Sequence, residues 1–114
     1  MSAFYIMKYT GPFGVGGGTL YIGKGQIMGT DVLGGKYEGH YTEANGRMSG
    51  TVTMTAPPGG APLITGQRMP SGGTVNLTFE FPSDRFADGT PQTMLGVEGV
   101  PIQISFEKIR DLAL

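Results

Sequence analysis

The sequence has no cysteine, one histidine and few charged residues. Without cysteine there is no disulfide framework, no thiolate nucleophile and no cysteine-based zinc or iron–sulfur site. Charged residues make up 15% of the 114 residues, whereas about a quarter is usual. The net charge of -1 argues against direct nucleic-acid binding, because phosphates require a clustered cationic face.

Long apolar runs are absent as well. No window approaches the roughly 18 uninterrupted apolar residues of a membrane span, and residues 1–9 lack the basic start and long apolar stretch of a signal peptide. We therefore expect no membrane partner and a cytoplasmic protein. The length predicts a single domain over residues 1–114.

Glycine and two-residue alternation are what the sequence does contain. Apolar and polar residues alternate in segment after segment between glycine-containing turns, which is typical of half-buried strands. The turn at Lys24-Gly25 predicts a tight hairpin, because glycine accepts the positive φ that such turns need, and Asn45-Gly46 is the strongest short hairpin signal in the chain. The proline-rich stretch 56–73 predicts a long loop. The predicted strands are 3–9, 19–23, 26–31, 36–42, 47–55, 63–65, 74–81, 92–97 and 100–108, followed by a turn at 108–114.

The predicted fold class is all-β: a small antiparallel up-and-down barrel of about eight strands, because sequential hairpins close most simply in this way. The lumen of such a barrel is either filled by side chains or just wide enough for one small ligand. The residues expected to point inward are Phe4, Ile6, Leu20, Met48, Met54, Phe79 and Phe106.

No catalytic or metal-binding motif is complete in the sequence. His40, the one histidine, lies on the polar face of its strand, and no serine elbow accompanies it. The segment 84–89 resembles the start of a twelve-residue calcium loop. The third and twelfth positions of that loop require oxygen ligands, and here they are Phe86 and Leu95. The glycines at 14–18 precede a strand rather than a helix, so they predict a turn at the barrel rim instead of a phosphate loop. Glu38, Glu80 and Glu107 all fall on outward faces. We expect no catalysis, no metal and no cofactor.

A glycine-rich pattern follows the first predicted strand. Residues 16–31 read GGGTLYIGKGQIMGTD and residues 37–41 read YEGHY. This pattern, which covers roughly residues 3–55, resembles the GrlR family, negative regulators of type III secretion genes. Framework roles are expected for the residues of the two motifs: Gly25, Gly29, Asp31, Tyr37, Gly39 and Tyr41. Asp31 should bond turn amides, and the hydroxyls of the inward tyrosines need partners.

The resemblance implies a calycin-like, lipocalin-type barrel that forms a homodimer. It also implies a regulator that sequesters a transcriptional activator without touching DNA. The family uses an acidic loop after the Y-x-G-x-Y strand for this contact. The matching positions here, and thus the candidate partner-binding residues, are Glu43, Ala44, Asn45 and Gly46, of which only Glu43 is acidic.

Two functions remain open at this point. The first is a non-enzymatic regulatory or interaction protein of the GrlR type, and the alternative is a carrier that holds a small apolar ligand in the lumen. The volume of the lumen distinguishes them. A homodimer interface is expected among apolar residues that alternation leaves off the core face, such as Tyr5, Met7, Tyr9 and Ile109.

Overall fold

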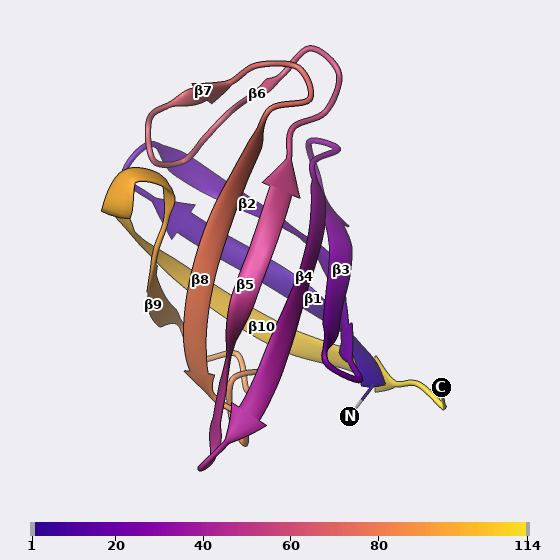
Figure 1. Ribbon diagram of the computed structural model, residues 1–114. Coiled ribbons are helices and arrows are strands. Elements are labelled where there is room, and N and C mark those ends of the chain that lie inside the picture. Colours follow the sequence, from indigo (N-terminus) through magenta and orange to yellow (C-terminus); the bar gives the residue numbers. More distant parts are fainter. Residues whose placement is uncertain (1, 114) are drawn as a thin grey trace.

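The computed structural model describes residues 2–113, and they form an antiparallel sheet of eight strands that curls almost closed into a barrel (Figure 1). The sheet contains β1 (Ser2–Gly11), β2 (Gly14–Gly23), β3 (Gln26–Asp31), β4 (Lys36–Ala44), β5 (Arg47–Thr55), β8 (Thr74–Pro82), β9 (Gln92–Leu95) and β10 (Pro101–Asp111). A separate hairpin is formed by β6 (Ala61–Pro62) and β7 (Arg68–Met69), and η1 (Val97–Gly99) is a short 3-10 turn. Within residues 2–113, no helix has the length and apolar character needed to cross a membrane.

Neighbours along the chain are also neighbours in the sheet. The strand order is β8-β5-β4-β3-β2-β1-β10-β9, with every pair antiparallel. Pairing of β10 with β1 brings the two ends of the chain together, and β8 then approaches β9 without a hydrogen-bonded ladder. The predicted all-β antiparallel barrel is therefore confirmed.

The two predicted hairpin turns are present. Lys24 and Gly25 have φ values of 51° and 77°, and Asn45 and Gly46 have values of 54° and 74°. Two consecutive positive φ angles match the right-handed twist of the flanking strands, which is why such turns close hairpins. The strands on either side therefore pair in an unbroken register, Gly23 opposite Gln26 and Ala44 opposite Arg47.

The predicted faces of β1 are wrong. Tyr5 and Met7 point inward and are 1% and 4% exposed, whereas Phe4 is 43% exposed and Ile6 is only half-buried. Alternation could not decide between the faces, because both carry large apolar side chains. Lys8 shares the face of Phe4, and an unpaired buried ammonium costs far more than an exposed ring.

Three predicted segments also differ from the structure. β2 begins at Gly14, so the glycines at 14–18 lie in a strand rather than a turn. The predicted strand 63–65 lies in the connection between β6 and β7. β10 continues to Asp111, where a turn over 108–114 was expected; residue 114 lies outside the described residues. The extension of β2 could not be predicted, because glycines carry no side chain that could show alternation. Backbone pairing with β1 is what continues the strand through residues 14–18.

An aromatic plug, defined as Tyr5, Phe81, Phe86 and Phe106, fills the barrel end away from the β6–β7 hairpin. Phe86 comes from the segment between β8 and β9, and its ring centroid lies 5.3 Å from that of Tyr5 and 5.7 Å from that of Phe106. Phe81 approaches Phe106 at 5.7 Å. Phe106 meets Phe81 and Phe86 edge to face, and Tyr5 meets Phe86 at a tilt. Rings in such contacts pack favourably, so this end of the lumen is filled.

Candidate functional site: an apolar cavity with one polar corner

The lumen holds a cavity of about 290 Å³ beyond the aromatic plug. Its walls are aliphatic, thioether and aromatic side chains from strands around the barrel, among them Leu20, Ile22, Met54, Leu77 and Met94. The expected inward positions of Leu20, Met48, Met54, Phe79 and Phe106 are confirmed, since all five line the cavity. Voids of this size are rare in packed interiors, so the lumen is only partly filled.

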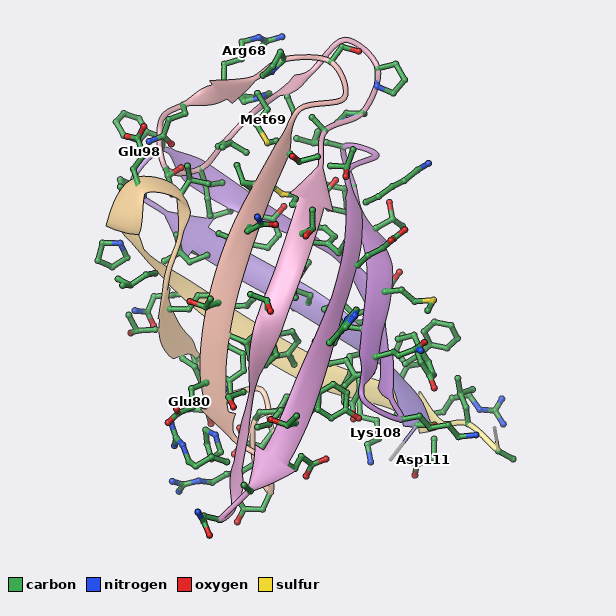
Figure 2. All side chains as sticks on the ribbon, in the orientation of Figure 1. Arg68, Met69, Glu80, Glu98, Lys108 and Asp111 are labelled. Atoms are coloured by element: carbon green, nitrogen blue, oxygen red, sulfur yellow. The ribbon has the colours of Figure 1, made fainter. Side chains whose placement is uncertain are left out.

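A lid, residues 56–73, covers the end of the barrel opposite the plug (Figure 1). The Phe13 amide donates to the Ile64 carbonyl at 2.9 Å, and Gln67 Nε2 donates to Glu98 Oε2 at 2.9 Å. Figure 2 shows Met69 pointing from the lid into the barrel while Arg68 points away. The lid is therefore held to the β1–β2 turn and to η1, and it contributes an apolar ceiling to the cavity.

The polar corner consists of Asp31, Tyr9 and Tyr37, all of which line the cavity. The Tyr37 hydroxyl donates to Asp31 Oδ2 at 2.8 Å, and the Tyr9 hydroxyl donates to the same oxygen at the longer distance of 3.4 Å. Tyr37 is 7% exposed. The bond from Tyr37 is thus the stronger of the two, because hydrogen bonds to a carboxylate weaken as they lengthen.

The other carboxylate oxygen of Asp31 organises the turn between β3 and β4. Oδ1 accepts from the Leu33 amide at 3.0 Å and from the Gly35 amide at 2.9 Å. The expected bonding of Asp31 to turn amides is therefore confirmed, and the Tyr37 hydroxyl has the partner that burial requires. The contact with Tyr9 was missed, because that residue was assigned to the outer face.

Burial raises the pKa of both tyrosines of the corner. Desolvation raises the pKa of Tyr37 far above its usual range, and it raises the pKa of Tyr9 as well. The nearby carboxylate of Asp31 acts in the same direction, since a phenolate would be repelled by it. Both hydroxyls, which are neutral at physiological pH in any tyrosine, therefore stay neutral hydrogen-bonding groups at alkaline pH as well.

Apolar residues at the mouth of the cavity are exposed to solvent. Phe13, Val15, Val32 and Leu33 are 73%, 77%, 76% and 56% exposed, and all four line the cavity. Phe13 lies in the β1–β2 turn, Val15 lies at the start of β2, and Val32 and Leu33 lie in the β3–β4 turn. Clusters of exposed apolar side chains are typical of binding sites, so this rim is the natural entrance.

The remaining framework residues support the barrel. Tyr41 is buried and its amide donates to the Gly25 carbonyl at 3.0 Å. Side-chain atoms would not fit at two glycines: a Cβ at Gly29 would lie 2.1 Å from the Thr19 carbonyl oxygen, and one at Gly39 would lie 2.2 Å from that of Thr51. These strands approach each other more closely than a side chain would allow.

The candidate partner-binding residues Glu43, Ala44, Asn45 and Gly46 lie at the plug end, away from the cavity mouth. Glu43 and Ala44 end β4, Asn45 and Gly46 form the turn to β5, and all four are exposed. A bond from the Ser83 amide to the Gly46 carbonyl at 2.9 Å ties the turn to the chain after β8. Their proposed contact with a partner stays a prediction.

The predicted dimer interface needs correction. Tyr5 and Met7 are buried, and Tyr9 lines the cavity, so of the four expected residues only Ile109 is an outward residue, at 52% exposure. A different outer apolar row, defined as Phe4, Tyr21 and Met28, crosses β1, β2 and β3. Phe4 is opposite Tyr21, and Tyr21 is opposite Met28.

Other groups tested in the sequence lie on the outer surface. His40, Glu38, Glu80 and Glu107 are exposed. Glu80, labelled in Figure 2, lies on the outside of the barrel, and its carboxylate pairs with Arg47 at 3.0 Å. Among residues 2–113, no cluster of three or more histidine, cysteine, aspartate or glutamate side chains could hold a metal ion. The cavity is therefore the feature of the described chain most suited to binding.

Comparison of the chain with models of protein families, with curated proteins and with solved structures gives no match. The resemblance to the GrlR family stays a prediction. The observed class is that of a small antiparallel β-barrel with an internal apolar cavity.

Proposed function

We propose that the protein binds one small, mainly apolar molecule inside a calycin-like barrel, without catalysing its conversion. The observation that carries the proposal is the cavity of about 290 Å³. An engineered apolar cavity of about 150 Å³ takes up benzene, so a cavity with about twice that volume has room for a larger apolar molecule. Of the two functions left open by the sequence, an incompletely filled lumen favours the carrier.

The walls and the entrance support this function physically. Apolar side chains surround the cavity, and burial of apolar ligand surface is favourable in such a site. The exposed rim of Phe13, Val15, Val32 and Leu33 gives an arriving apolar molecule its first contacts. The aromatic plug closes the far end, so the ligand enters and leaves beside the lid.

Binding is tested with N-phenyl-1-naphthylamine, an uncharged probe whose fluorescence rises when it leaves water. We expect saturable binding with one probe per chain. Val52→Phe places a larger side chain in the lumen and should weaken binding at least about ten-fold by occupying cavity volume. Thr51→Phe adds the same side chain to the exposed face of β5 and is the matched control.

Two results would contradict the proposal. One is fluorescence that rises linearly with protein without saturation. The other is equal loss of affinity in Val52→Phe and Thr51→Phe, which would place the probe outside the lumen.

Protein–protein recognition is the second candidate function, and the outer apolar row favours it. Phe4 and Met28 are 43% and 46% exposed, and the Phe4 and Tyr21 rings meet edge to face at 6.2 Å. Aromatic and methionine side chains are enriched at protein interfaces. We propose that a second copy of the chain covers this row; a GrlR-type regulator in the cytoplasm would be such a dimer and would bind a transcriptional activator.

A further inference from the structure

We infer that the ligand carries a hydrogen-bond donor, a hydroxyl or a protonated amine, at its outer end, and that Asp31 makes the site reject carboxylates. The inference rests on the proposed binding of an apolar molecule in the lumen. It concerns the polar corner, which the apolar walls alone do not explain.

The charge of the lining supports this selectivity. Asp31 is the one charged side chain among the described residues that line the cavity, and no lysine, arginine or histidine of residues 2–113 accompanies it. A carboxylate placed at the mouth would face Asp31 with no cation to offset the repulsion, which is strong at short range in surroundings less polar than water. A protonated amine would be attracted, and a hydroxyl would be tolerated.

The hydrogen-bonding capacity of the corner points the same way. Both protons of the two phenols are directed to Asp31 Oδ2. A phenol oxygen that has donated its proton can still accept, and a carboxylate oxygen only accepts. The groups left for a ligand are therefore acceptors, and their complement is a donor. The bond from Tyr9 is long at 3.4 Å, so Asp31 Oδ2 keeps the capacity to accept a further hydrogen bond from a ligand donor.

Local backbone geometry holds these acceptors in place before a ligand arrives. The two amide bonds to Oδ1 fix the carboxylate on the β3–β4 turn. A Cβ at Gly35 would lie 2.9 Å from Asp31 Oδ2, and one at Gly16 would lie 2.5 Å from Tyr9 Cζ. Glycine at these two positions leaves room for the carboxylate and the ring. A polar group fixed in this way orients its ligand without losing entropy on binding.

The test compares three ligands with the same ten-carbon chain: decan-1-ol, decylamine and decanoate. Each competes with N-phenyl-1-naphthylamine at neutral pH, where the amine is protonated and the carboxylate is ionised. We expect decan-1-ol and decylamine to displace the probe and decanoate to bind at least about ten-fold more weakly than decan-1-ol. In Asp31→Asn, decanoate should come within about three-fold of decan-1-ol.

Asp84→Asn is the matched control, because it removes one negative charge from an exposed carboxylate away from the cavity lining. It should keep the selectivity of the native chain. Circular dichroism checks that Asp31→Asn folds; if it does not, the native chain decides alone. Equal binding of decanoate and decan-1-ol by the native chain would overturn the inference and leave the proposed function standing. If the native chain binds neither the probe nor any of the three ligands, both the inference and the proposed function are overturned.

Discussion

Replacing Tyr37 with phenylalanine removes one oxygen atom from the polar corner and little else. The ring stays in its buried place, so the change isolates the bond from the hydroxyl to Asp31 Oδ2 at 2.8 Å. Hydrogen bonds to a charged group contribute about 1.5–3 kcal/mol, because the unpaired charge is costly to leave behind. We expect Tyr37→Phe to lower the free energy of unfolding by that amount.

Tyr9→Phe is the matched control for this prediction. Its hydroxyl reaches the same oxygen at 3.4 Å, so the loss should be at most about 1 kcal/mol. Urea denaturation followed by circular dichroism measures both variants, and an unchanged slope against urea shows that the same surface unfolds. A loss below about 0.5 kcal/mol in Tyr37→Phe, or equal losses in the two variants, would refute the assignment of Tyr37 as the main partner of Asp31.

Three further predictions concern pH, the plug and the oligomer. Burial raises the pKa of Tyr37 and Tyr9 in the folded chain, so these groups should leave the free energy of unfolding unchanged below about pH 10 and lower it above that pH, where unfolded tyrosines ionise. When this free energy is measured at rising alkaline pH, it should fall less steeply in Tyr37→Phe than in the native chain. Phe86→Ala opens a hole in the plug at a residue that is 3% exposed, and urea denaturation should show a loss of about 3–5 kcal/mol. Light scattering should give twice the chain mass of 12.0 kDa, and Met28→Lys in the outer apolar row should restore the single mass; a native chain that stays at that single mass at all concentrations would refute the dimer.

Local turn chemistry explains why most of the fold could be predicted from the sequence. The pairs Lys24-Gly25 and Asn45-Gly46 adopt positive φ angles, which glycine and asparagine accept readily, and each pair fixes the register of its hairpin. Clean alternation in β4, β5 and β8 then placed Tyr37, Tyr41 and Met48 inward, as observed.

The errors arose where the local pattern is weak. Both faces of β1 carry large apolar side chains and only Lys8 marks the outer face, so alternation alone did not place Tyr5 against Phe86 inside the barrel. The volume of the cavity depends on how far Phe86 reaches in from a connecting segment and on where the lid places Met69. These are long-range packing outcomes, and no periodicity encodes them. Assignment of Tyr9 to the outer face concealed the third member of the polar corner for the same reason.

Methionine methyl groups provide the most direct test of binding inside the lumen. The chain has seven methionines, and Met28 lies on the outer face at 46% exposure. Those that line the cavity are Met7, Met48, Met54, Met69 and Met94.

Titration of ¹³C-methyl-methionine protein with decan-1-ol, followed by NMR, should shift the methyl signals of the cavity methionines, above all Met54 and Met69, while Met28 stays unchanged. A saturable shift confined to the cavity set is the result that the account predicts. Shifts of Met28 alone, or no saturable shift of any methionine, would contradict the binding of an apolar molecule inside the barrel.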